Sequence, residues 1–317
     1  MENDDEPAVE FDEPEVEEAR QTKGMRAPTM PTKQEREDHE RDHIPFRNWC
    51  AHCVRGKSKS SGHYSAAPDT ERSKPIVSLD YAFLGIKQGK DKAECTKLEE
   101  EAEVAGHTPQ LIMFDSESKG TYAYVARQKG ADEHLCRRIV DDLDNMGYKQ
   151  VVMKSDQEPA LRTLIETVKA TWNGDAALEN SPVGESESNG AVERAIQTWS
   201  GQVRTMKDAL ESRLKCDIPA EHPIMTWLVE YAATLIRRCS VGADGKTPHE
   251  KIKGRPSRRP VAEFGEKLWF RPLHDRKTKL DMVIEEGIFG GLIGRSDEAL
   301  IAVENGVVKC RSLFNFR

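Results

Sequence analysis

Short apolar runs alternate with amphipathic segments between residues 75 and 180 of this 317-residue chain. Apolar residues recur at helical spacing in 132–146, where acids stand at the start and Gly147 follows the end, and again after Pro159. The polar segment 173–188 has room for one short strand at 176–178. Four other runs are rich in residues that favour strands: 75–85, 111–114, 122–125 and 151–153. This alternation predicts a compact α/β domain.

Two longer helical patterns follow. The first begins near residue 190 and carries six apolar residues on one stripe: Val192, Ile196, Trp199, Val203, Met206 and Leu210. The second, 223–239, is rich in apolar residues, which predicts a helix packed inside the same domain. Three strands, a helix, a strand and further helices match the order of a ribonuclease-H-like mixed sheet core flanked by helices.

The last part of the chain predicts a small β-rich region. Leu268 and Phe270 alternate with other residues, and the later runs at 288–293, 299–303 and 307–311 fit a small barrel-like sheet. Residues 246–279 hold eleven basic and four acidic residues, a local charge of +7. Basic residues beside Trp269 and Phe270 suit contact with a DNA backbone. The alternative is a solvated connector with ordinary core aromatics.

The formal net charge of −8 is concentrated at the N-terminus. Residues 1–20 hold ten acids and one arginine, a local charge of −9, which leaves about +1 for the remaining residues. Residues 1–38 contain few large apolar side chains, so we expect a disordered acidic tail. Such a tail either solubilises the chain or mimics nucleic acid toward a basic partner.

Composition and terminal sequence exclude several classes. No apolar run approaches the roughly 18–20 residues of a membrane span. The acidic N-terminus has neither the basic nor the apolar region of a secretory signal. Seven cysteines without regular spacing favour a reducing compartment. We therefore expect an intracellular protein, nuclear or cytoplasmic, that is not secreted and has no membrane partner.

The string HERDHIPFRNWCAHC holds a candidate metal site. His39 and His43 are four residues apart, which puts both on one helical face. Cys50 and Cys53 form a Cys-x2-Cys chelate suited to tetrahedral zinc. The alternative is a pair of reduced cysteines beside a solvated histidine pair. Two further histidines are spare candidates: His52 and His63.

Three acids stand where they can share divalent metal ions. Asp80 lies in the first strand run, Asp156 follows the run at 151–153, and Glu193 lies near the start of the next long helix. Carboxylates from neighbouring strands and a crossing helix would supply the oxygen ligands that two Mg²⁺ ions prefer. Such ions serve phosphodiester chemistry by neutralising charge on the entering and leaving oxygens. The alternatives are aspartates that cap turns and a glutamate that complements the helix dipole.

Taken together, these motifs resemble those of integrases of long-terminal-repeat retrotransposons of the copia and gypsy types. The similar segments are VSLDYAFLG around Asp80, VVMKSDQEPAL around Asp156 and ESNGAVERAIQTW around Glu193. The 36 residues between Asp156 and Glu193 are close to the spacing in the family's D,D-35-E signature. SDQEP departs from the family, since many relatives carry Asn-Gly after the aspartate. The resemblance covers roughly residues 39–250.

The resemblance implies a catalytic core over 72–245, in which the three acids bind two Mg²⁺ or Mn²⁺ ions. It also implies 3′-end processing and strand transfer by a homo-oligomer, with element ends and target DNA as partners. The family's His-His-Cys-Cys module corresponds to a zinc-knuckle-like segment and basic linker over 39–63. Residues 246–317 correspond to a basic linker and a β-rich C-terminal region. The rival functions are a metal-dependent nuclease on this fold and a non-catalytic DNA-binding protein derived from an integrase.

Basic residues in two regions are candidates for DNA contact. One group follows Glu193 on its helix, and the other lies in the basic segment toward the C-terminus. For the first group, an ordinary polar helix face is the alternative. The candidates are Arg194, Arg204, Lys207, Arg258, Arg259, Lys267 and Arg271.

Overall fold

A computed structural model describes most of the chain. The described residues are 30–57, 74–86, 94, 97–98, 101–102, 104–156, 158–180, 190–258, 261–272, 280, 282–294 and 296–314. The acidic segment 1–29, the basic linker after residue 57, His63 and Arg259 lie outside this set, and the expectations stated for them remain predictions.

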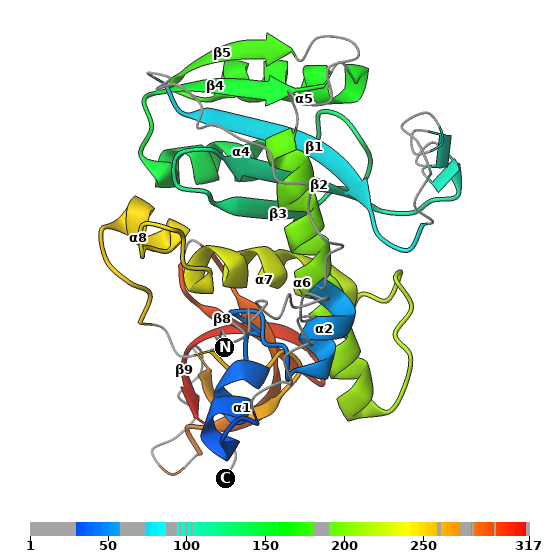
Figure 1. Cartoon of the computed structure of the whole chain (residues 1–317), viewed down its shortest axis with the longest axis vertical. Coiled ribbons are helices and arrows are strands. Elements are labelled where there is room, and N and C mark those ends of the chain that lie inside the picture. Colours follow the sequence, from blue (N-terminus) through cyan, green and yellow to red (C-terminus); the bar gives the residue numbers. More distant parts are fainter. Residues whose placement is uncertain are drawn as a thin grey trace, which may run out of the picture.

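The core is a five-stranded mixed sheet with the strand order β3-β2-β1-β4-β5 (Figure 1). Its strands are β1 (Ile76–Phe83), β2 (Pro109–Asp115), β3 (Thr121–Val125), β4 (Gln150–Ser155) and β5 (Asp175–Asn180). Neighbours among β1, β2 and β3 pair antiparallel, whereas β4 pairs parallel with both β1 and β5. Each strand lies where an apolar run predicts one. The expected mixed α/β fold class, with helices flanking the sheet, is confirmed.

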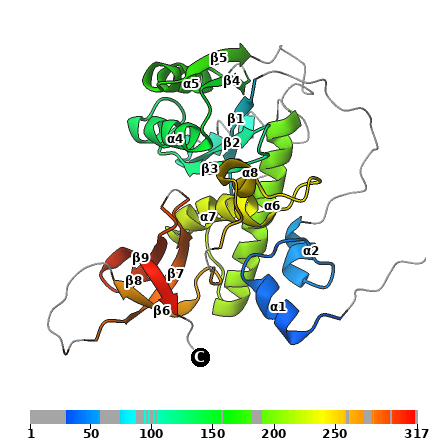
Figure 2. The ribbon, with the colours of Figure 1, turned by 90° about the vertical axis from the view of Figure 1, so that its left-hand side faces the viewer.

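Strand alternation divides the apolar side chains between the two faces of the sheet. Val77, Leu79 and Tyr81 of β1 belong to the core that α4 and α5 cover, and Ile112 and Ala123 belong to the core shared with α6 and α7. Figure 2 shows α4 and α5 on one side of the sheet and α6 on the other. The four helices are α4 (Glu133–Met146), α5 (Pro159–Thr171), α6 (Gly190–Leu214) and α7 (Ile224–Cys239). None of the described helices combines the length and apolar character needed to cross a membrane.

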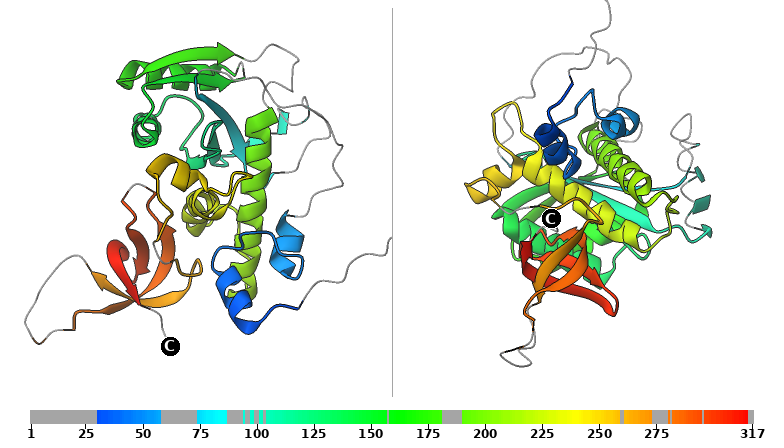
Figure 3. Two further views of the ribbon diagram at one scale, coloured as in Figure 1. Left: turned by 60° about the vertical axis from the view of Figure 1, so that its left-hand side comes forward. Right: turned by 90° about the horizontal axis from the view of Figure 1, so that it is seen from below.

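The C-terminal region is a small closed barrel that packs against α7 (Figure 3). Its strands are β6 (Lys267–Pro272), β7 (Glu285–Leu292), β8 (Ala299–Val303) and β9 (Gly306–Phe314), and α8 (Pro248–Lys253) lies in the connection to it. Two glycines of β7 permit the contact, because a Cβ on Gly290 would come within 2.7 Å of the Trp227 ring and one on Gly291 within 2.8 Å of Tyr231. The predicted β-rich region is therefore confirmed.

Two short helices, α1 (Lys33–Glu40) and α2 (Ala51–Lys57), form an N-terminal module. Thr32 caps α1 reciprocally with Glu35: the Thr32 hydroxyl accepts from the Glu35 N–H at 3.2 Å, and the Glu35 carboxylate accepts from the Thr32 N–H at 2.8 Å. The helix therefore begins inside the segment 1–38 that composition predicts to be disordered. The prediction of disorder rests on the acid-rich composition and does not take account of the capping box in this segment.

Replacing Trp199 by alanine should destabilise the fold strongly. The Trp199 side chain is fully buried in the core between the sheet and α7, and its indole N–H donates to the Val229 carbonyl at 3.0 Å. The cavity and the unpaired carbonyl should cost about 3–5 kcal/mol in denaturant unfolding. Leu214→Ala on the same helix is the control, because Leu214 is 52% exposed. Similar losses in both variants would contradict this packing.

Candidate metal centre and catalytic face

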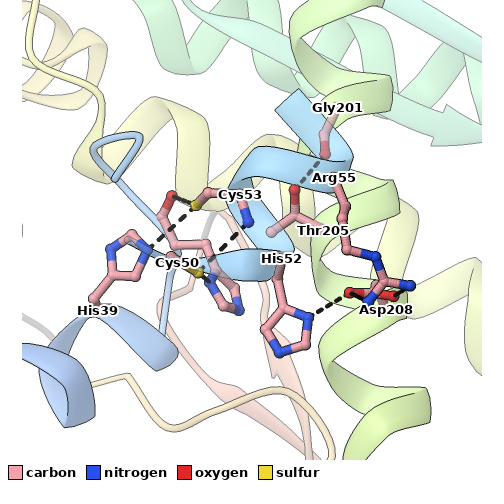
Figure 4. Close-up of polar contacts among 9 residues, drawn as sticks. His39, Cys50, His52, Cys53, Arg55, Gly201, Thr205 and Asp208 are labelled. Carbon is pink, nitrogen blue, oxygen red and sulfur yellow. Dashed lines mark hydrogen bonds and ion pairs between the residues drawn. The ribbon is translucent and has the colours of Figure 1, made fainter. Parts of the chain in front are cut away.

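The N-terminal module brings the four predicted zinc ligands together. His39 lies near the end of α1, and Cys53 lies in α2 (Figure 4). His43 lies in the loop between these helices, and Cys50 is the last residue of that loop. His43 adopts a left-handed backbone conformation, with φ of 55°, just after α1 ends. One candidate ligand atom from each residue lies within 4.8 Å of the others. The predicted cluster is therefore present as a geometric unit.

The geometry and burial of the cluster suit a tetrahedral ion. His39 Nε2 lies 3.3 Å from Cys53 Sγ, and His43 Nδ1 lies 3.6 Å from Cys50 Sγ. The edges of a tetrahedral zinc site with ordinary bond lengths would be about 3.3–3.8 Å. All four side chains are buried. His43 faces Cys50 with Nδ1, while its other ring nitrogen, Nε2, is buried without a hydrogen-bond partner.

The two cysteine thiols shift each other's pKa in opposite directions. The hydrogen bond from the Cys53 thiol lowers the pKa of the Cys50 thiol, and the same bond raises the pKa of Cys53. Contacts with the two histidines lower the pKa of Cys50 further. The lowered pKa favours the thiolate form of Cys50, which is the form that binds metal. This electrostatic arrangement supports the candidate metal centre.

The module is attached to α6 by close backbone packing of α2. A Cβ added to Gly56 would lie 2.2 Å from Thr205 Oγ1 and 2.9 Å from the Thr205 backbone nitrogen. Gly201, one turn earlier on α6, approaches the Gly56 carbonyl in the same way. Arg204 donates two hydrogen bonds, at 3.1 and 3.3 Å, to that carbonyl. The described part of the module is therefore docked on α6 through α2.

Polar contacts around Asp208 reinforce this docking (Figure 4). The carboxylate of Asp208 pairs with the imidazole of His52 and, at 2.7 Å, with the guanidinium of Arg55. Gln202 of α6 donates to the Asp42 carbonyl at 2.7 Å. His52 thus serves the interface with α6, and it is not a member of the metal cluster that its sequence position suggested.

Two of the three predicted catalytic acids come from neighbouring strands, Asp80 within β1 and Asp156 directly after β4. In the parallel pairing of β1 with β4, Ser78 stands opposite Lys154. Asp80 lies two residues beyond Ser78 on β1, so alternation directs both side chains toward the same face of the sheet. Asp156 follows Lys154 by two residues, one position past the end of β4. Asp80 also pairs with Ile112 of β2, whose side chain belongs to the core shared with α6. Asp80 therefore belongs to the face that α6 crosses, and Asp156 follows the end of the neighbouring strand.

Glu193 lies in the first turn of α6 and is exposed. Its helix packs on the face of the sheet to which Ile112 and Ala123 belong. The three carboxylates do not, however, form a second cluster comparable to the His/Cys group among the described residues. Residue 157 and the segment 181–189, which adjoin two of the acids, are outside the described set.

Lys154 is a candidate that the sequence predictions did not include, and it lies on the same sheet face as Ser78 and Asp80. Its side chain is only 10% exposed, and its ammonium lies 3.3 Å from the Glu179 carboxylate of β5. A lone lysine inside the apolar run VVMKS was the available signal, because lysines are almost never buried without a partner. The structure thus adds a nearly buried lysine two residues before Asp156.

The predicted DNA-contact residues have different environments. Arg194 is exposed on α6 near Glu193, and Arg258 and Arg271 are exposed as well. Lys207 pairs with Glu211, and Lys267 pairs with Glu286 at 2.6 Å. Arg204 is exposed but hydrogen-bonds the docked module. Among the described DNA-contact candidates, Lys207 and Lys267 are therefore paired with glutamates of the same chain.

No protein-family model matches the chain, and no curated protein matches it. Among solved structures, it is similar to the catalytic core domain of BIV integrase (14% identity, TM-score 0.37, covering 56% of this chain and 93% of that one). It is also similar to a chain of the simian T-cell lymphotropic virus intasome in complex with PP2A regulatory subunit B56 gamma (13%, 0.40, 83% and 86%). A third is the HTLV-2 integrase catalytic core domain in complex with magnesium, in a trimeric form (12%, 0.35, 56% and 95%). At these identities and TM-scores, no residue assignment transfers to this chain.

Gly56→Ala should weaken the docking of the module on α6. The new methyl group would collide with the backbone of Thr205, so one helix must shift, at a cost of about 1–3 kcal/mol in the free energy of unfolding. Gly190→Ala is the matched control, because a Cβ there meets nothing within 4 Å. Denaturant unfolding measures both. Unchanged stability in Gly56→Ala would rule out the close contact between α2 and α6.

Proposed function

We propose that the chain is a DNA-joining enzyme of the retrotransposon integrase type, with Asp80, Asp156 and Glu193 as its catalytic acids. The observation that carries the proposal is the parallel pairing of β1 with β4, in which both aspartates follow a matched residue pair by two positions. The helix of Glu193 packs on the sheet face to which Asp80 belongs. The sequence motifs around the three acids support the same assignment.

The acids fit divalent ions by their chemistry, because Mg²⁺ and Mn²⁺ prefer carboxylate oxygens. When bound, a pair of such ions would neutralise charge on the attacking and leaving oxygens. The chain itself orients two of the acids. The Tyr81 N–H donates to Asp80 Oδ1 at 2.9 Å, and the Glu158 N–H donates to Asp156 Oδ1 at 3.0 Å. Packing of α6 sets the approach of Glu193.

The proposed reaction has two phosphoryl-transfer steps. In the first, water attacks a phosphodiester near the end of the element DNA, and a DNA 3′-hydroxyl leaves. In the second, that 3′-hydroxyl attacks a phosphodiester of target DNA, so one P–O bond forms as the bond to the target 3′-oxygen breaks. Joining two DNA ends to one target favours a homo-oligomer. Arg194, Arg258 and Arg271 are the exposed candidates for backbone contact.

We also propose zinc as the ion of the His/Cys cluster. Two imidazoles and two thiols in a buried, tetrahedral arrangement are the donor set of structural zinc sites. The ion would join α1 and its following loop to α2, and α2 in turn packs on α6. His39, His43, Cys50 and Cys53 would all be ligands, which leaves no open position for substrate.

Conservative replacement of each acid should abolish DNA strand transfer. Asp80→Asn, Asp156→Asn and Glu193→Gln each remove one anionic ligand. We therefore expect losses greater than the roughly 10–100-fold seen for outer-shell partners of metal sites. The assay is covalent joining of a labelled element-end duplex to target DNA with Mg²⁺ or Mn²⁺. Asp217→Asn, which changes an exposed acid just beyond the other end of α6, is the control and should retain activity.

The same assay separates the rival functions. A nuclease on this fold would release metal-dependent cleavage products without covalent joining. A non-catalytic DNA-binding protein would retain the duplex without either product. Strand transfer that persists in any of the three variants, with normal unfolding behaviour, would sink the proposed catalytic role.

Zinc content should depend on the four residues of the His/Cys cluster and not on cysteines elsewhere in the chain. We expect one zinc per chain by plasma mass spectrometry and its loss in Cys53→Ser, together with a lower unfolding midpoint, because structural zinc contributes folding free energy. Cys216→Ser is the control, since Cys216 is exposed. Equal zinc content in the two variants would show that these four residues are not the site.

A further inference from the structure

A groove beside the docked module has no role in the proposed reaction. Its volume is about 930 Å³, and its walls are the loop after α1, one side of α6 and the end of α7. Phe46 on the loop is 47% exposed and Val241 after α7 is 65% exposed. Ile196 and Ile236 add apolar surface between them. The groove therefore offers apolar contact to a segment of chain.

The charge of this groove is one-sided. Among the described residues that line it, Lys57 and Arg204 are cationic and none is acidic. Both cations are held in place by backbone carbonyls: Lys57 donates to the His43 oxygen at 2.6 Å, and Arg204 donates to the Gly56 oxygen. The described lining itself supplies no acidic partner to these cations, and the acidic groups close to Lys57, Asp42 and Cys50, lie outside it. An occupant of this groove should combine negative charge with apolar side chains.

The groove also lies along the side of α6 that carries Glu193. Gln197, Ser200 and Arg204 line it at successive helical intervals of three and four residues, and Glu193 precedes Gln197 by four. A segment bound there would lie beside the approach to the proposed catalytic face. Interference of such a segment with nucleic acid at that face rests on the proposed function, whereas binding of the segment in the groove does not.

The N-terminal segment of this chain enters the described structure next to the groove. Met30 and Pro31 line a neighbouring pocket of about 690 Å³, which shares Ile44, Pro45 and Phe46 with the groove. The 29 residues before Met30 can span up to about 100 Å when extended, so reach does not limit them. The lining of the neighbouring pocket is acidic on balance, with Glu35, Asp38 and Asp42 against Arg47. Repulsion there favours the groove on the other side of the shared loop.

The sequence of this segment has the required chemistry. Residues 1–20 carry a local charge of −9, and Val9, Phe11 and Val16 are interspersed among the acids. We propose that residues 8–18 bind in the groove between the module and α6, with their apolar side chains against Phe46 and Val241 and their acids toward Lys57 and Arg204. The acidic segment then acts as an internal competitor of nucleic acid on this side of α6.

The test is a fluorescence anisotropy titration of a labelled peptide of residues 1–29. The receptor is the full chain with its ten acids at positions 2–18 replaced by Asn or Gln, so that its own segment does not compete. We expect saturable binding that weakens with added salt. Phe46→Ala and Gln197→Glu should each weaken it by about fivefold or more.

Matched controls isolate the groove. Phe314→Ala removes a phenylalanine that is 46% exposed on the barrel, and Gln150→Glu adds an acid at an exposed position of β4. Both should leave peptide affinity unchanged. A peptide of the same composition with its apolar residues gathered at one end should bind at least about fivefold more weakly. If this peptide binds as tightly as the natural one, charge attraction alone explains the binding, and the proposal is overturned.

A duplex DNA probe, titrated into the same proteins, tests whether nucleic acid occupies the groove instead of the peptide. The proposal expects the unsubstituted chain to bind the duplex more weakly than the chain with the neutralised segment. If the duplex binds, loses affinity in Phe46→Ala and Gln197→Glu, and the peptide fails to bind, the groove belongs to nucleic acid and the proposal fails. Peptide binding by an Asp156→Asn receptor keeps this result separate from the proposed catalysis, because it requires no active site.

Discussion

Packing of α6 is the constraint on which the other parts of the structure depend. This helix of 25 residues buries Trp199, Val203 and Met206 against the sheet and α7. Another side of the same helix meets α2 at Gly201 and Thr205. The barrel packs against α7, and the segment that leads into it contacts α6 directly, where Arg213 donates to the Phe264 carbonyl at 2.6 Å. Residues far apart in sequence thus share one support, and a shift of α6 would move Glu193, the metal module and the support of the barrel together.

The N-terminal module illustrates how much depends on this support. Its helices have eight and seven residues, fewer than the roughly 12–15 at which isolated helices become even marginally stable in water. Two other contributions compensate: the buried His/Cys cluster holds its two halves together, and α6 covers α2. Ligand geometry and helix docking are therefore coupled, because Gly56 is only three residues from Cys53.

Sequence patterns predict most of the fold because the relevant signals are local. The alternation in 76–83 and the caps at Asp132 and Gly147 specify elements without reference to distant residues. The metal ligands lie within fifteen residues, so their spacing also carries the prediction. The docking of Gly56 on Thr205 and of His52 on Asp208 joins segments about 150 residues apart, and no local pattern records it. Burial of Lys154 is likewise decided by strand pairing.

The central claim is that Asp80, Asp156 and Glu193 share metal ions on the sheet face crossed by α6. The most direct measurement is anomalous X-ray diffraction from crystals of the chain grown with Mn²⁺. This account predicts anomalous peaks bounded by oxygens of these three carboxylates, separate from the His/Cys cluster. Manganese bound elsewhere, or a refined structure in which the three carboxylates point away from one another while Mn²⁺ is present, would contradict it.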